Sequence, residues 1–214
     1  MKILVTGFDP FGGEKVNPAY EAVKLLPDNI AGAEIIKLEI PTVFTRSVSV
    51  VEEAIIKHLP DVVLGIGQAG GRSSITVEKV AINLAEARIP DNDGEQPLDQ
   101  YIKSDGETAY FATIPVKAIV NNIREHGIPA NVSYTAGTYV CNSIMYNVLY
   151  LTHRKYLDIR AGFIHVPFST EQAAGKPEGT ASMTIETISK AIECAIEVIA
   201  ENKGESKDFM GTIM

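Results

Sequence analysis

A cysteine at the start of an amphipathic helix is the strongest chemical signal in this chain. Residues 131–136 have strand character, Gly137 interrupts them, and the apolar residues after position 141 recur at helical spacing. This pattern places Cys141 near a helix N-terminus. The partial positive charge there favours a thiolate, so we expect a lowered thiol pKa and a nucleophilic sulfur.

A histidine at the end of another strand could act as the base for that thiol. The apolar run 161–167 carries His165 near its end. If this strand lies parallel to 131–136 in one sheet, the thiol and the imidazole emerge at the same edge, where open α/β sheets place their sites. A histidine at a strand end is also often a hydrogen-bonded structural residue. The other three histidines are poorer candidates because they lie near predicted helix ends: His58, His126 and His153.

Two carboxylates compete for the role of orienting the histidine. Strand periodicity puts Glu78 on the same face as Val80 and Ile82, an unfavourable place for a charge without a partner. Glu78 either holds the histidine tautomer whose second nitrogen faces the thiol or faces water on an edge strand. Asp91 lies in a Pro-Asp-Asn-Asp-Gly segment, so it is either a turn residue or a support for the site.

A glycine-rich segment matches a dinucleotide-binding pattern. Residues 65–70 read G-x-G-x-x-G and follow a predicted strand. This motif binds pyrophosphate only when its glycines open a helix, and the residues that follow have β character. We therefore expect the glycines to let the backbone approach a small ligand closely, and a nucleotide site would require a helix after Gly70.

The composition excludes several classes of protein. The 214 residues carry a net charge of −8 with scattered Lys and Arg, which argues against a nucleic-acid or anionic-membrane partner. No apolar run is long enough to span a bilayer, and the N-terminus lacks a signal-peptide pattern, so we expect a cytoplasmic protein. The two cysteines make no disulfide framework, and Cys194, inside the last predicted helix, fits a small buried core residue.

Alternating strands and helices predict the fold class. This alternation implies an α/β fold with three layers, α/β/α, around a largely parallel twisted central sheet in a single domain. We expect the domain to span residues 1–200 and the polar segment 201–214 to be a poorly ordered C-terminal tail. The predicted strands are 3–6, 34–40, 61–66, 76–83, 131–136 and 161–167, and the predicted helices follow Asn17 and Cys141 and cover 48–59, 115–126 and 183–200.

Several separated motifs together resemble one enzyme family. The chain is similar to the pyrrolidone-carboxylate peptidases, which are the cytoplasmic, cysteine-type pyroglutamyl peptidases. The motifs run in the family's order from residue 1 to about residue 170, which is more specific than any single motif. They are TGFDPFGG (6–13), NP (17–18), GQAGGR (67–72), EKVAIN (78–83), ARIPDN (87–92), SYTAGTYVCN (133–142) and GFIHVP (162–167).

The resemblance implies an activity: members of this family remove an N-terminal pyroglutamyl residue from peptides with a Cys-His-Glu triad, without a metal or another cofactor. Carried over, the triad is Cys141, His165 and Glu78. Because the family places its carboxylate there, Glu78 is preferred to Asp91 as the third member. The sulfur attacks the pyroglutamyl carbonyl to form a thioester, which water hydrolyses. The expected oxyanion donors are Arg88 and the backbone N–H of Cys141.

The resemblance also implies how the substrate ring is held. A pyroglutamyl group is a small, uncharged lactam, so an apolar pocket with one or two amide-directed hydrogen bonds suits it. Phe8 and Phe11 are expected to stack against the ring, although without the resemblance both fit ordinary packing. Asn17 and the backbone near Gln68 contact the lactam in the family, while Asn17 before a proline is also a good helix N-cap.

The family commonly forms homotetramers, so the resemblance implies a homo-oligomer here. The apolar flank of the last helix, with Phe209 and Met210, is a candidate interface, and Ile213 could dock with them on a neighbour. The implied partner is a peptide with an N-terminal pyroglutamate. The alternative from another class is a non-catalytic protein that binds a lactam or a nucleoside in the same pocket.

Overall fold

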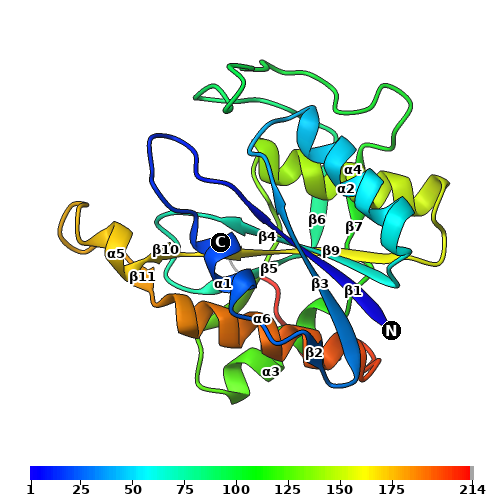
Figure 1. Cartoon of the computed structure of the whole chain (residues 1–214), viewed down its shortest axis with the longest axis vertical. Coiled ribbons are helices and arrows are strands. Elements are labelled where there is room, and N and C mark those ends of the chain that lie inside the picture. Colours follow the sequence, from blue (N-terminus) through cyan, green and yellow to red (C-terminus); the bar gives the residue numbers. More distant parts are fainter. Residues whose placement is uncertain (213–214) are drawn as a thin grey trace.

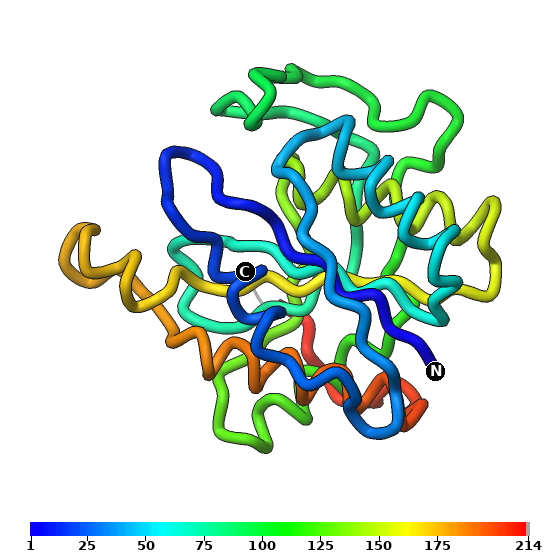
Figure 2. Tube along the Cα trace, in the orientation of Figure 1, coloured from blue at the N-terminus to red at the C-terminus, as the bar shows by residue number. Residues whose placement is uncertain are grey.

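The computed structural model describes residues 1–212 and folds them around a twisted sheet of seven strands (Figure 1, Figure 2). The strand order across the sheet is β2-β3-β1-β4-β9-β5-β8. The strands are β1 (Lys2–Phe8), β2 (Asn29–Ile30), β3 (Ala33–Ile40), β4 (Val62–Gln68), β5 (Ile75–Glu78), β8 (Ala130–Ser133) and β9 (Arg160–Val166).

Helices cover both faces of this sheet, so the expected three-layer, single-domain α/β fold is confirmed (Figure 1). One face carries α1 (Pro18–Lys24), α3 (Val116–Glu125) and α6 (Ile185–Ala200), and the other carries α2 (Arg46–His58) and α4 (Val140–Arg154). No helix in the described part of the chain is long and apolar enough to cross a membrane. The smaller elements are β6 (Val80–Ile82), β7 (Ala109–Phe111), β10 (Phe168–Ser169), α5 (Thr170–Ala173) and β11 (Ser182–Met183).

The centre of the sheet is parallel and its outer strands are reversed. Neighbours among β3, β1, β4 and β9 pair in parallel, and β1, β4 and β9 are almost continuously buried, as is typical of strands covered on both faces. β2 is antiparallel to β3, and β5 is antiparallel to β9. β8 pairs in parallel with β5, so it also runs against the central strands.

The direction of β8 changes the reason why the cysteine and the histidine can meet. From the sequence, we expected the two residues to meet on the condition that the strand before Cys141 runs parallel to the strand that carries His165. This condition is not met, because β8 runs opposite to β9. β8 ends at Ser133, and the irregular segment 134–139 then leads to the start of α4 at Val140. That segment, rather than the strand direction, places Cys141.

The predicted strand 76–83 is two strands in different sheets. β5 ends at Glu78, and β6 begins at Val80 and pairs antiparallel with β7. The inference that Glu78 shares a face with Val80 and Ile82 is therefore wrong. Glu78 is fully buried because it ends a strand that lies beside β9 in the main sheet.

The glycine-rich segment leads into a strand. Residues 65–68 belong to β4, and after a turn the chain enters β5 at Ile75 without an intervening helix. A dinucleotide site needs a helix N-terminus at that point. The nucleotide-binding hypothesis is therefore wrong.

The chain after α6 runs back along α3 without regular structure. Oε1 of Glu205 accepts a hydrogen bond from the backbone N–H of Lys117 (2.8 Å) at the start of α3. That helix has no side-chain cap of its own, so Glu205 caps it. The poor order expected for 201–214 stays a prediction, and Ile213 lies outside the described residues.

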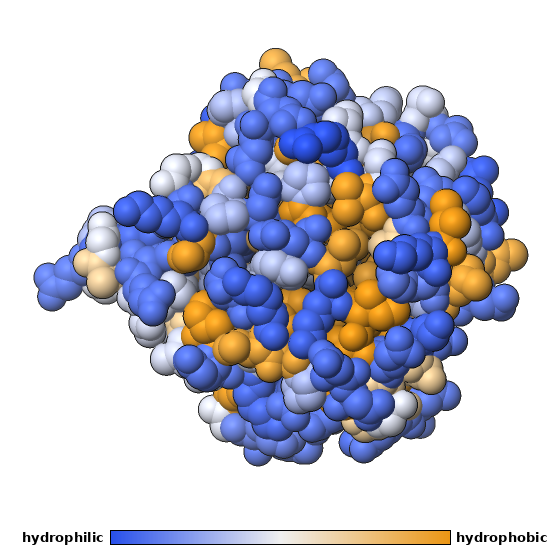
Figure 3. Space-filling model, in the orientation of Figure 1, coloured by the Kyte–Doolittle hydropathy of each residue, from blue (hydrophilic) through white to orange (hydrophobic). Residues whose placement is uncertain are grey.

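At the edge of the sheet formed by β2 and β3, the short strand β2 covers only the first residues of β3. β2 pairs only with the start of β3, and Ile36 and Leu38 further along β3 are partly exposed. In Figure 3 hydrophobic surface gathers on the part of this face where β3 lies in Figure 1. Phe209, expected at an interface, is fully exposed, and Met210 packs partly buried against the core.

Candidate active site

A cavity of about 180 Å³ lies at the carboxyl edge of the parallel strands. It is smaller than the roughly 300–1,000 Å³ of pockets for drug-sized ligands, so it suits a small group. Of the predicted site residues, all line it except Glu78, Arg88 and Asp91. The lining residues are Phe8, Phe11, Asn17, Thr42, Gln68, Ala69, Arg72, Ala136, Gly137, Tyr139, Cys141 and His165.

His165 and Glu78 form a buried pair behind this cavity. His165 on β9 faces Thr76 on the antiparallel strand β5. Glu78 follows two residues later, so its side chain projects from the same face of the sheet as that of His165. Nδ1 of His165 lies 2.7 Å from Oε1 of Glu78. An ionised carboxylate can only accept, so Nδ1 carries the proton and Nε2 is free to act as a base.

The sulfur of Cys141 lies on the same face, against Gly67. A Cβ atom added at Gly67 would lie 2.9 Å from Sγ of Cys141 and 2.8 Å from Cζ of Phe163, so only glycine leaves room there. Gly67 is the register partner of His165 in the neighbouring strand, and paired strands lie about 4.8 Å apart. The structure therefore brings the thiol and the imidazole to one cavity, one strand apart.

The expectation of a lowered thiol pKa is wrong for the resting protein. Cys141 is the second residue of α4, but burial raises its pKa to about 12 and the negative charge of Glu78 adds to the shift. Burial also lowers the pKa of His165, against the hydrogen bond with Glu78, which raises it. The loss of solvation outweighs the helix dipole, so the resting pair is a thiol and a neutral imidazole.

Arg72 holds Glu78 in place, a role that the sequence pattern did not predict. Its Nη1 donates to Oε1 of Glu78 (2.7 Å) and to Oγ1 of Thr76, and its Nη2 donates to the carbonyl oxygen of Thr135 (3.2 Å). Burial alone would raise the pKa of Glu78, but the hydrogen bonds from His165 and Arg72 bring it below its ordinary value. Glu78 is therefore ionised. The only signal in the sequence was the place of Arg72 in the GQAGGR run.

Gln68 is oriented by a residue that is far away in the sequence. Nε2 of Gln172 donates to Oε1 of Gln68 (3.0 Å). Gln172 is itself fixed by a capping box with Ser169 at the start of α5. Because the side-chain oxygen of Gln68 is engaged, its NH₂ group is left to donate toward the cavity. Gln172 was not predicted, since nothing in a polar helix start indicates which distant side chain it contacts.

Asn17 is the N-cap of α1, which was one of its two expected roles. Its Oδ1 accepts from the backbone N–H of Ala19 (3.1 Å), and its Nδ2 donates to the carbonyl oxygen of Asp9 (3.0 Å). The same side chain lines the cavity. Asn17 therefore fixes the loop after β1 and contributes to the wall of the site.

Aromatic rings make up the apolar side of the cavity. Phe8 is 2% exposed, and its ring centroid lies 6.4 Å from that of Phe163 in the core. Phe11 lies 6.1 Å from Tyr139, which was not predicted as a site residue. The Tyr139 hydroxyl donates to the carbonyl oxygen of Pro90 (3.1 Å), so this ring also ties down the loop that follows β6.

Asp91 is held by backbone N–H groups of its own loop and of the segment before α2. Its Oδ2 accepts from the N–H of Phe44 (2.9 Å), and its Oδ1 accepts from the N–H groups of Asp93 (2.9 Å) and Glu95 (2.8 Å). Oδ1 is therefore engaged in a turn, and Oδ2 connects that turn to the segment before α2. The geometry supports the turn interpretation, and the carboxylate that contacts the imidazole is Glu78.

Arg88 is a predicted residue that the structure does not bring to the cavity. Its side chain is exposed and, in the described part of the chain, makes no hydrogen bond or ion pair. The neighbouring Ile89 lies close to Gly12, on the loop that carries Phe11. Arg88 thus borders the rim of the site, and it would have to swing inward to meet a bound substrate.

Comparisons with known proteins point to one family. The family model described as pyroglutamyl peptidase matches residues 1–202. A pyrrolidone-carboxylate peptidase of Enterococcus faecalis is 59% identical over 212 residues, which cover 99% of each chain. A pyrrolidone-carboxylate peptidase of Clostridium perfringens is 56% identical over 213 residues, which cover 100% of each chain.

Solved structures share the whole fold. Pyroglutamyl peptidase I from Bacillus amyloliquefaciens matches with a TM-score of 0.94 at 47% identity, covering 97% of this chain and 99% of that one. Pyrrolidone carboxyl peptidase from Thermococcus litoralis matches with a TM-score of 0.92 at 39% identity, covering 97% and 98%. Sequence, fold and family model agree, and this chain belongs to the pyroglutamyl peptidase family.

Proposed function

We propose that the chain hydrolyses the peptide bond after an N-terminal pyroglutamyl residue, with Cys141 as nucleophile, His165 as base and acid, and Glu78 as the group that orients the imidazole. The observation that carries this proposal is the buried Glu78–His165 pair, one strand from the Cys141 sulfur in a small cavity. A nucleophile, a base and an orienting acid are the parts that covalent acyl transfer requires.

Acylation begins with a proton transfer that accompanies attack. Nε2 of His165 takes the thiol proton of Cys141 while the sulfur bonds to the pyroglutamyl carbonyl carbon and the carbonyl electron pair moves to oxygen. The imidazolium then gives this proton to the departing amine, the C–N bond breaks, and a thioester remains. Because both groups are neutral at rest, the proton moves from the sulfur to His165 as the bond from sulfur to the electrophilic carbon forms.

Deacylation repeats the step with water. His165 takes a proton from a water molecule, the resulting hydroxide attacks the thioester carbon, and the C–S bond breaks. The proton returns to the sulfur of Cys141, and pyroglutamate leaves. In both steps Glu78, kept ionised by its hydrogen bonds with Arg72 and His165, stabilises the transient imidazolium.

The start of α4 supplies a donor for the oxyanion. First-turn N–H groups of a helix have no intrahelical partner, and α4 has no side-chain cap hydrogen bond. The backbone N–H of Cys141 therefore suits the carbonyl oxygen under attack, and one such donor typically lowers a barrier by about 2.7–4 kcal/mol. Arg88 becomes a second donor only when its exposed side chain turns toward the substrate.

The lining explains a preference for a lactam over a free amino terminus. Among the described residues that line the cavity, none is acidic, so an α-ammonium group would find no counter-charge there. Arg72 adds a positive charge to the wall. The rings of Phe8 and Phe11 provide the apolar sides, and the amides of Asn17 and Gln68 face the polar edge of the lactam.

We also propose a homotetramer that works in the cytoplasm. Both cysteines are free thiols, which fits a reducing compartment. The open edge of β3, with partly exposed Ile36 and Leu38, offers a surface for a second copy. Light scattering coupled to size exclusion tests the assembly, and a monomer at micromolar concentration would contradict it.

The activity is tested with a pyroglutamyl-aminocoumarin substrate beside the matching prolyl and glutaminyl compounds. We expect fluorophore release from the pyroglutamyl compound alone, loss of activity with iodoacetamide, and no effect of a chelator. Mass spectrometry of the quenched reaction should find the pyroglutamyl group on Cys141. Stabilisation by pyroglutamate in a thermal-shift assay without hydrolysis of any pyroglutamyl peptide would instead fit the non-catalytic binding protein.

A further inference from the structure

A second group of thiol, imidazole and carboxylate lies between α3 and α6, on the face of the sheet opposite α4. His126 follows the last residue of α3, and Cys194 and Glu197 lie on α6. One ligand atom from each of these side chains lies within 4.8 Å of the others. We propose that these three residues, the α3–α6 cluster, form a binding site for a divalent metal ion of the zinc class.

The donor types suit such an ion. Thiolate, imidazole and carboxylate are the three ligand types that zinc uses in proteins, while magnesium and calcium take oxygen ligands. Cys194 and Glu197 stand three positions apart, so they share one face of α6. Two anionic ligands with one divalent ion make a neutral group, which lowers the cost of placing the ion beside a buried thiol.

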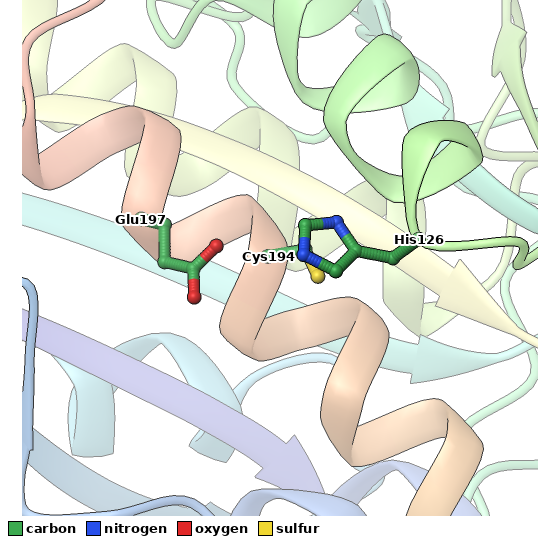
Figure 4. Close-up of side chains that lie close together, drawn as sticks. All are labelled: His126, Cys194 and Glu197. Carbon is green, nitrogen blue, oxygen red and sulfur yellow. The ribbon is translucent and has the colours of Figure 1, made fainter.

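The histidine is already oriented as metal ligands usually are. Nδ1 of His126 lies 2.8 Å from the carbonyl oxygen of Asn122, so it carries the proton and Nε2 has a free lone pair. In Figure 4 one ring nitrogen of His126 faces Cys194 and Glu197 while the other points away from them. A ligating histidine typically gives its second N–H to a carbonyl or carboxylate in this way.

Asn122 also connects the other two ligands. Its Nδ2 donates to the carbonyl oxygen of Cys194 (2.8 Å) and lies 3.4 Å from Oε2 of Glu197. Nζ of Lys190 lies 3.9 Å from Oε1 of the Glu197 carboxylate. These contacts hold the carboxylate of Glu197 beside the imidazole, and a bound ion would replace the charge of Lys190 as its partner.

Small side-chain movements would complete the coordination. With bonds of about 2.3 Å to sulfur and about 2.0 Å to nitrogen or oxygen, ligand atoms around one zinc ion lie within about 4 Å of each other. Cys194 is fully buried and fixed, while His126 is exposed and Glu197 half-buried, so these two can close the distance. The exposed side leaves a fourth position for water. Binding exchanges the thiol proton for the metal and releases that proton to solvent.

This site would fasten the end of α3 to α6, away from the catalytic cavity. A ligand that binds only the folded protein stabilises it, so zinc should raise the melting temperature without being needed for hydrolysis. A metal can also bind the catalytic thiol and imidazole, so the experiment uses the full chain with Cys141→Ala. Cys194 is then the sole thiol, since the sequence has two cysteines.

The experiment is a titration of the Cys141→Ala protein with Co²⁺, followed by Zn²⁺. We expect a near-ultraviolet thiolate-to-cobalt band that saturates at one ion per chain and disappears when Zn²⁺ displaces it. Zinc at about 100 times its Kd should raise the melting temperature by roughly 5–10 °C. Absence of the band, or a band that persists when Cys194→Ala is added, would overturn the proposal.

Matched variants in the same background separate ligands from neighbours. Glu197→Gln should weaken cobalt binding by about tenfold or more, while Glu193→Gln, on the same helix, should leave it within about twofold. His126→Gln should likewise weaken binding, and His153→Gln should not, although Nδ1 of His153 makes the same kind of contact with a helix carbonyl (2.7 Å to Leu149). Equal effects within either pair would refute the assigned ligands. Unchanged metal-free melting temperatures control for folding.

Discussion

Cysteine, histidine and glutamate meet twice in this molecule, once at the catalytic cavity and once in the α3–α6 cluster. In the cavity Nδ1 of His165 contacts a buried carboxylate, whereas in the cluster Nδ1 of His126 contacts a helix carbonyl. A carboxylate stabilises the imidazolium that appears when a thiol proton is transferred, and a carbonyl does so far less. His126 therefore lacks the counter-charge that a proton-transfer histidine uses, while a carbonyl partner remains compatible with a metal ligand.

The surroundings of the two thiols differ as much as their partners. Cys141 is half-buried and lines a cavity that can hold a substrate, while Cys194 is fully buried in a helix interface. Burial raises the pKa of both thiols, to about 12 for Cys141 and about 11 for Cys194. A raised resting pKa thus does not distinguish a nucleophile from a core thiol. A nucleophilic thiol is distinguished by access for a substrate and by a neighbouring base.

The largest expected effect on kcat comes from replacing each of the two cysteines by alanine in a separate variant. Cys141→Ala should lower kcat for a pyroglutamyl substrate by on the order of 10⁴–10⁶, because Cys141 is the one thiol among the described residues that line the cavity. Cys194→Ala should keep kcat within about twofold. Steady-state kinetics with both variants provide the measurement. Activity that survives Cys141→Ala would remove the assigned nucleophile.

The second largest effect on kcat is expected at Glu78 and should be absent at Glu197. Glu78→Gln should lower kcat by about 10²–10⁴, because an amide can hold the wrong tautomer of His165 and cannot balance the imidazolium charge. Glu197→Gln should leave kcat unchanged because it lies in the α3–α6 cluster. A thermal melt of each variant shows that it is folded. A kcat for Glu78→Gln equal to that of the wild type would mean that the imidazole needs no carboxylate.

Local sequence patterns predicted most helices and strands well, but they did not predict the order and direction of the strands in the sheet. The apolar runs of β1, β4 and β9 and the helix after Cys141 were recognisable because burial and periodicity are properties of neighbouring residues. The direction of β8 and the break at Lys79 were missed because strand order and pairing depend on residues far apart in the chain. From the sequence, Cys141 was placed beside His165 on the condition of parallel strands, but β8 and β9 run in opposite directions.

The site divides in the same way. Residue types and motif resemblance supplied six of the twelve residues that line the cavity. They gave no role to Arg72, whose contact with Glu78 depends on the turn before β5. Gln172 reaches Gln68 across 104 positions, a contact that no local pattern contains. Arg88 was expected at the oxyanion and lies exposed, because the conformation of a long loop depends on its surroundings. The sequence therefore indicated which residues carry the chemistry, but it did not indicate which distant residues hold them in place.

A smaller effect is expected at the glycine that makes room for the thiol. The methyl group of Gly67→Ala would meet Sγ of Cys141 and the ring of Phe163, so we expect a loss of about 1–3 kcal/mol in the free energy of unfolding and a lower kcat. Gly175→Ala is the matched control, because its Cβ would meet no atom closer than 3.9 Å. Urea unfolding and steady-state kinetics measure both. Equal stability of the two variants would show that the sulfur does not rest against this strand.

The smallest expected effect is a pH dependence of stability that comes from the catalytic histidine. Burial lowers the pKa of His165 in the folded protein below its ordinary value of 6.5, so as the pH falls below 6.5 the unfolded chain binds a proton that the folded protein does not. Stability from this group is complete above pH 6.5 and decreases below it, by at most about 1.4 kcal/mol per pH unit. Glu78, with its pKa below 4.5, acts only at lower pH. Urea unfolding at pH 7.5 and 5.5 should therefore show a loss that is smaller in His165→Gln, and an equal loss in both proteins would mean that His165 is not held neutral by burial.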